Sequence, residues 1–192
     1  MEFRTKINTG KSQATITYSD PVLFIGSCFT SSIGMQMDAG RMPVMINPSG
    51  TVYNPVSVIN TLKTITSKRL FSSSDLYNHN GTWLSFSHYT DFSSEDKEEA
   101  LDKINRKLQE TADFISGAKF LFVTFGTARV FRLKETGEIV SNCHKLPADM
   151  FSRELLSVDE ISRMWMSQLD FLQENFPQLK VVFTVSPVRH WK

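Results

Sequence analysis

Residues 22–32 read VLFIGSCFTSS, and this segment sets the expected fold. The four apolar residues Val22 to Ile25 predict a short buried strand. Gly26 then lets the chain turn sharply, and the hydroxyl residues after it are typical of the start of a helix. Such a turn presents side chains at the carboxyl edge of a sheet, beside unpaired backbone N–H groups. Ser27 and Cys28 are therefore candidate nucleophiles; the alternative is a tight turn in which only small residues fit.

Strand-like and helix-like patterns alternate along the rest of the chain. Short apolar runs predict central strands at 44–46, 119–125 and 179–185. Apolar residues at helical spacing predict helices at 33–39, 56–66, about 96–116 and 157–176. Weaker patterns predict a hairpin at 130–140, a half-exposed strand at 83–88 and edge strands at 3–7 and 15–17. This order predicts one α/β domain over residues 1–192, with a mainly parallel sheet.

Short polar segments follow four of the predicted strands. They are residues 26–28, 47–50, 126–129 and 186–190. Ligands bind beyond the carboxyl ends of strands in open parallel sheets, so these segments are expected to converge on one rim. Gly50 can direct its N–H at an anion there. Arg129 and Arg189 can hold a carboxylate, a phosphate or a sugar hydroxyl, or are simply surface charges.

Cys28 has the better position for nucleophilic chemistry, because a helix N-terminus favours the reactive thiolate form of a cysteine. Ser27 would need an adjacent base. A buried, inert Cys28 is the structural alternative. Three histidines are candidate bases: His144 in a polar cluster after the hairpin, His190 on the predicted rim and His88 at the end of the half-exposed strand. His79 is interpreted as an ordinary turn residue.

Composition narrows the range of partners and cofactors. The net charge of +1 does not suggest nucleic acid or an acidic membrane surface, and two cysteines are too few for a disulfide scaffold. The sequence shows no signal peptide or membrane span, so a cytoplasmic location is expected. No metal site is predicted, since the adjacent Cys143 and His144 lack a second pair at zinc spacing. No cofactor is predicted; the hydroxyl-rich run 27–32 leaves a flavodoxin-like phosphate loop as an alternative.

Four segments in order resemble a known family. Residues 26–30, GSCFT, resemble the signature of the GSCFA family, with Thr30 in the final alanine position. Residues 126–128, 142–145 and 186–190 resemble further segments of that family. The similarity spans about residues 3–192. Family members are typically longer, and the chain stops soon after its last predicted strand, so we expect truncation at the C-terminus.

The GSCFA family is similar in turn to the SGNH-hydrolase superfamily. That resemblance implies a three-layer α/β/α sandwich and ester hydrolysis or acyl transfer. It puts Cys28 in the place of the nucleophile and Ser27 in the place of the aspartate beside it. It makes Gly50 an oxyanion donor. It also aligns the third sequence block of that superfamily with Gly126 and the residues after it. Ala128 stands where that block has an asparagine donor.

The expected function is thus an SGNH-like esterase or acyltransferase acting on a small or carbohydrate-linked ester. The final Asp-x-x-His block of the superfamily has no match before Lys192; we expect either that it lies beyond Lys192 or that His190 or His144 substitutes for it. The predicted catalytic set is Cys28, Ser27, His144 and His190, with Gly50, Gly126, Arg129, Arg189 and His88 as oxyanion or substrate-binding residues. The alternative is a non-catalytic glycan- or anion-binding module of the same fold. The sequence leaves the substrate and the oligomeric state open.

Overall fold

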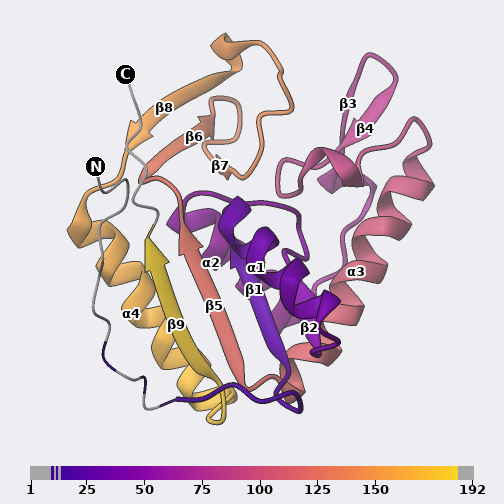
Figure 1. Cartoon of the computed structure of the whole chain (residues 1–192). Helices are drawn as coiled ribbons and strands as arrows, with labels where there is room; N and C mark the ends of the chain where they lie inside the picture. Colours follow the sequence, from indigo (N-terminus) through magenta and orange to yellow (C-terminus); the bar gives the residue numbers. More distant parts are fainter. Residues whose placement is uncertain (1–9, 11, 13, 186–192) are drawn as a thin grey trace, which may run out of the picture.

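The computed structural model describes residues 10, 12 and 14–185. Four strands form the central sheet in the order β2-β1-β5-β9 (Figure 1). Their bounds are Val22–Gly26 for β1, Val44–Ile46 for β2, Phe120–Phe125 for β5 and Lys180–Val185 for β9. All neighbouring strands in this sheet run parallel. The structure therefore confirms the predicted α/β class with a mainly parallel sheet.

Strand β1 lies between β2 and β5 and is buried along its whole length. Leu23 and Ile25 point into one core cluster, whereas Val22 and Phe24 point into a second cluster on the opposite face. The ring of Phe24 stacks on that of Phe122 in β5, with 5.1 Å between the ring centroids. A strand covered on both faces needs an unbroken apolar run. The four apolar residues at 22–25 meet that need.

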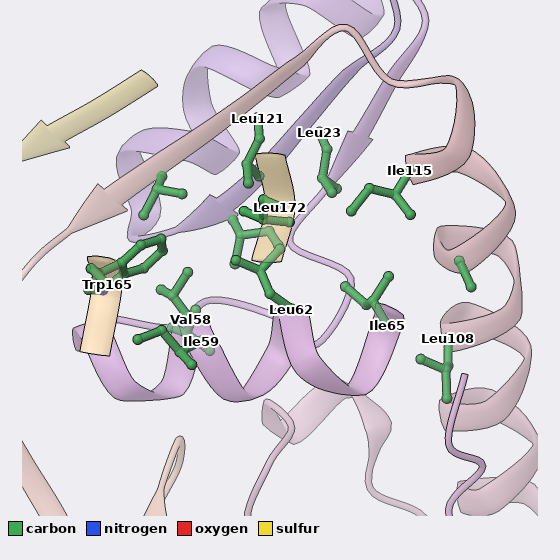
Figure 2. Close-up of a cluster of buried hydrophobic side chains, with 14 of the residues drawn as sticks. Leu23, Val58, Ile59, Leu62, Ile65, Leu108, Ile115, Leu121, Trp165 and Leu172 are labelled. Carbon is green, nitrogen blue, oxygen red and sulfur yellow. The ribbon is translucent and has the colours of Figure 1, made fainter. Parts of the chain in front are cut away.

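Helices cover both faces of the sheet, which completes the three-layer arrangement. They are α1 (Cys28–Ala39), α2 (Pro55–Ser67), α3 (Lys97–Gly117) and α4 (Val158–Asn175). Helix α1 packs on one face through Ile33 and Met37. Helices α2, α3 and α4 share the core of the other face with Leu23 and Leu121. Figure 2 shows α2 presenting Leu62 to these strands.

The helix boundaries follow their capping residues. Asn54 caps α2 through the Ser57 N–H, and Pro55 occupies the first helical turn, where its missing N–H costs nothing. Asp96 caps α3, and Ser157 forms a capping box at the start of α4. Helix α1 starts at Cys28, earlier than the predicted 33–39, because Ser27 is its N-cap.

Two small antiparallel sheets lie beyond the carboxyl edge of the central sheet (Figure 1). One is the hairpin of β3 (Tyr77–His79) and β4 (Thr82–Leu84). The other joins β6 (Arg129–Leu133) to β7 (Ile139–Val140) and to β8 (Phe151–Leu155). Short 3-10 helices form at Ser73–Asp75, Thr90–Phe92 and Ala148–Met150. The predicted hairpin at 130–140 is confirmed, and β8 extends it.

One predicted strand is too long, and another does not form. The strand expected at 83–88 ends at Leu84, because the His88 N–H turns back to the Ser85 carbonyl at 3.1 Å. No strand forms at 15–17; the Thr17 N–H instead donates to the Asp20 carboxylate at 2.8 Å in a turn. The strand expected at 3–7 lies outside the described residues. Over the part of the chain that the structure describes, no helix is both long and apolar enough to cross a membrane.

Truncation of Leu62 tests the packing of α2 on the sheet. Leu62 is fully buried, so Leu62→Ala is expected to lower the free energy of unfolding by about 2–5 kcal/mol, measured by urea denaturation. The control, Asn60→Ala, changes an exposed residue of the same helix and is expected to stay within about 0.5 kcal/mol of wild type. Equal losses in the two variants would contradict this orientation of α2.

Candidate functional site at the β1–α1 turn

The turn between β1 and α1 depends on the close approach of Gly26 to β5. Gly26 has a φ of +149°, and a Cβ built on it would lie 2.3 Å from the Thr124 carbonyl oxygen. The next N–H, that of Ser27, donates to the same oxygen at 3.2 Å. On the other side, the Gly26 carbonyl accepts the Val52 N–H at 3.0 Å. The turn is thereby fixed to both β5 and the loop after β2, and it requires glycine.

The turn points its two candidate nucleophiles in different directions. Ser27 is 4% exposed, and its hydroxyl accepts the Phe29 N–H at 3.4 Å as the N-cap of α1. Cys28, the first residue of the helix, is exposed and forms no disulfide. The structure thus places the thiol in solvent and the hydroxyl in the interior.

Asn47 holds this turn in place, and the sequence analysis did not select it. Its side-chain oxygen accepts the buried Gly26 N–H at 2.8 Å, and its amide donates to Thr30 Oγ1 at 3.1 Å and Ser31 Oγ at 2.8 Å. Asn47 has a φ of +41°, a left-handed conformation that asparagine tolerates better than most residues. Its place directly after the predicted strand 44–46 was the one available signal in the sequence.

Two tyrosines on the loops around this turn were also not predicted from the sequence. Each is seated against a glycine: a Cβ on Gly50 would lie 2.1 Å from Tyr89 Cβ, and one on Gly126 would lie 2.9 Å from Tyr53 Cδ1. Tyr53 and Tyr89 are 43% and 40% exposed. Partial burial raises the pKa of Tyr53, and the negative charges of Cys28 and Tyr89 raise it further. The Tyr53 phenol therefore stays protonated at neutral pH.

The backbone around these tyrosines is already hydrogen-bonded. The Gly50 N–H, expected to face an anion, donates to the Asn47 carbonyl at 2.7 Å. The N–H groups of Gly126 and Thr127 both donate to the Tyr53 carbonyl, at 2.8 and 3.1 Å. These bonds tie the loop after β2 to the end of β5. The structure therefore brings Gly50 and Gly126 to the rim as supports for the tyrosines.

Of the other three candidate residues at the rim, the structure describes Arg129. Arg129 begins β6, is partly buried, and its N–H donates to Thr127 Oγ1 at 3.0 Å. Arg189 and His190 lie outside the described residues.

His88 and His144 lie together, and both bind Ser85. His88 Nδ1 lies 2.9 Å from Ser85 Oγ, and His144 Nε2 donates to the Ser85 carbonyl at 2.9 Å. The His88 ring is buried edge-on against Phe71, with 4.8 Å between centroids. Burial, and to a smaller extent the charge of His144, lowers the pKa of His88 to about 4. Burial also lowers the pKa of His144, against the effect of its backbone hydrogen bonds to Ser85 and His88.

These histidines form a cluster of their own, apart from the thiol. Over residues 14–185, neither His88 nor His144 forms a hydrogen bond with Cys28. A cavity of about 20 Å³ lies against His88, which is room for one water molecule. A polar groove of about 770 Å³ runs between α2 and the β6–β7 hairpin and reaches Ser85, and Cys28 does not line it. Among the described residues, no group of three or more histidine, cysteine or acidic side chains is placed to hold a metal ion.

Comparison with known proteins gives one match. The model of the GSCFA family matches residues 21–192, a range that includes the β1–α1 turn, both tyrosines and the histidine cluster. No curated protein and no solved structure matches the chain. The similarity to SGNH hydrolases stays a prediction from the sequence motifs.

Removal of the Asn47 side chain tests the support of the turn. Asn47→Ala leaves the buried Gly26 N–H without an acceptor and puts alanine in a left-handed conformation, so we expect a loss of about 2–4 kcal/mol in unfolding free energy. Asn80→Ala is the control, because Asn80 has a φ of +51° at an exposed hairpin turn. It is expected to lose about 1 kcal/mol. Similar losses would show that the Asn47 hydrogen bonds contribute nothing.

The burial of His88 predicts acid sensitivity. The folded-state pKa of about 4 lies below the ordinary 6.5, so the unfolded chain binds the proton more readily. Stability is therefore complete above pH 6.5 and falls as the pH drops towards 4, by about 2 kcal/mol between pH 7 and pH 5. Urea denaturation at these two pH values is expected to show this loss in wild type and in His79→Asn, and to show much less of it in His88→Asn. An equal loss in His88→Asn would contradict the assignment.

Proposed function

The chain belongs to the GSCFA family, and from this premise we propose that it is an ester hydrolase or acyltransferase with the Cys28 thiol as its nucleophile. The observation that carries the proposal is the orientation of the turn. Cys28 is exposed at the first position of α1, whereas Ser27 is buried as the N-cap. An exposed sulfur at this position is open to an ester carbonyl, and the thiolate is the form of cysteine that attacks carbonyl carbon.

The chemistry follows from an exposed cysteine at the rim. Cys28 Sγ attacks the ester carbonyl, the C–O bond to the alcohol breaks, and the acyl group remains on sulfur as a thioester. Water then hydrolyses the thioester to release the acid and the thiol; an alcohol in place of water gives acyl transfer. The exposed aromatic residues Phe29, Tyr53 and Tyr89 suit a sugar ring or an apolar acyl chain. They support a small or carbohydrate-linked ester as the substrate class.

The mechanism also needs a general base, the group that accepts the Cys28 proton. His88 and His144 are each hydrogen-bonded to Ser85, and neither is hydrogen-bonded to Cys28. In this arrangement neither histidine therefore accepts the Cys28 proton. His190, outside the described residues, stays the predicted base. Because neither described histidine is hydrogen-bonded to the thiol, a second candidate function is a non-catalytic glycan- or anion-binding module. Turnover of an ester distinguishes the two.

Hydrolysis of p-nitrophenyl acetate by the full chain tests the nucleophile. Cys28→Ala is expected to reduce the rate to that of buffer, because no thiol is left at the rim. Cys143→Ala is the matched control and is expected to keep the wild-type rate, since Cys143 is half-buried away from the turn. Ser27→Ala is expected to keep the rate while losing about 1 kcal/mol of stability with the N-cap.

Two outcomes would overturn this assignment. Loss of activity in Ser27→Ala with activity retained in Cys28→Ala would make the serine the nucleophile. A folded wild-type protein that neither turns over esters nor reacts with iodoacetamide at Cys28 would favour the binding module.

A further inference from the structure

Attack on an ester puts a negative charge on the carbonyl oxygen, and a catalytic site needs hydrogen-bond donors for it. Near Cys28 most backbone donors are already engaged. The Gly26 N–H binds the Asn47 side chain, the Ser27 N–H binds the Thr124 carbonyl and the Gly50 N–H binds the Asn47 carbonyl. Over residues 14–185, the Cys28 N–H has no acceptor, as expected in the first turn of a helix. One backbone donor is therefore free at the nucleophile itself.

Tyr53 offers a side-chain donor on the loop beside this turn, and its position is fixed. Its carbonyl accepts two N–H groups from the end of β5, and its ring rests on Gly126. The preceding residue, Val52, donates its N–H to the Gly26 carbonyl at 3.0 Å, so the Tyr53 backbone lies beside the turn that carries Cys28. Among the described residues the Tyr53 hydroxyl has no hydrogen-bond partner, so it is free to donate. Ala128, further along the same rim, has only a methyl group to offer.

We infer that the Tyr53 hydroxyl donates a hydrogen bond to the oxyanion formed when Cys28 attacks an ester. The inference rests on the proposed function. The Cys28 N–H supplies the second hydrogen bond to the same oxygen. Tyr53 keeps its proton throughout, because its raised pKa holds the phenol neutral.

The step balances without a further reactant when it starts from the thiolate form of Cys28 and the leaving group is p-nitrophenolate. The Cys28 Sγ–C bond forms as the carbonyl π bond opens onto oxygen, where Tyr53 and the Cys28 N–H donate. The C=O bond then re-forms and the bond to p-nitrophenolate breaks. The products are the acyl thioester and the free phenolate anion, so no proton transfer is required. Reaction of Cys28 with iodoacetamide, by contrast, passes through no oxyanion.

The experiment compares acylation with alkylation in Tyr53→Phe. The burst of p-nitrophenolate from p-nitrophenyl acetate measures acylation, and it is expected to slow by about 10²-fold, as for loss of one oxyanion donor. The rate at which iodoacetamide alkylates Cys28 is expected to stay within about 2-fold of wild type, because the thiol itself is unchanged. Tyr18→Phe is the matched control, since Tyr18 is an exposed phenol in the turn before β1 that has no part in the site. It is expected to leave both rates unchanged.

Each of the other outcomes would contradict either the role of Tyr53 or the proposed function. Acylation of Tyr53→Phe at the wild-type rate would overturn the role of Tyr53 and leave the proposed function intact. An equal decrease in Tyr18→Phe would remove the assignment to Tyr53. Parallel loss of acylation and alkylation in Tyr53→Phe would show that Tyr53 supports the thiol and donates to no oxyanion. Absence of acylation in wild type would overturn the proposed function itself, and the inference with it.

Discussion

The contact between Gly26 and the end of β5 is the constraint on which the rest of the site depends. A side chain at Gly26 would lie 2.3 Å from the Thr124 carbonyl oxygen, so β1 and β5 pair to their ends only because the residue is glycine. The Gly26 N–H then faces away from β5, and Asn47 provides its acceptor. With both strands and the loop after β2 locked together, Ser27 faces inward as the helix cap and Cys28 faces solvent.

The fold could be predicted where its determinants are local in sequence. The run 22–25 is apolar because β1 is covered on both faces, and the apolar positions of α2 recur at helical spacing because one side of that helix meets the sheet. Prediction from the sequence failed where the structure depends on pairing or turns that involve other segments of the chain. The alternation at 83–88 resembled a strand, yet a turn interrupts it after Leu84. Strand β8 was missed because it forms by pairing with β6, from which it is separated by a hairpin and a loop.

In the candidate site too, features that are local in sequence were predictable, and features that depend on packing were not. The turn with Ser27 and Cys28 was predictable, since a strand, a glycine and a helix start are consecutive in the chain. Which of the two side chains faces solvent was not, because both are small and the answer depends on packing. His88 was a candidate base on its residue type, but its burial against Phe71 makes it a structural, neutral histidine. Tyr53 was missed because its position at the rim depends on contacts with the end of β5, which is distant in the sequence.

The central claim is that an accessible thiol at the start of α1 forms a covalent intermediate with an ester. The most direct measurement is mass spectrometry of the full chain incubated with p-nitrophenyl acetate, quenched in acid and mapped by peptide. We predict an acetyl group on Cys28 that neutral hydroxylamine removes, as it does from thioesters, with none on Cys143 or Ser27. A hydroxylamine-resistant oxygen ester on Ser27, or a folded protein that carries no acetyl group on Cys28, would contradict the account.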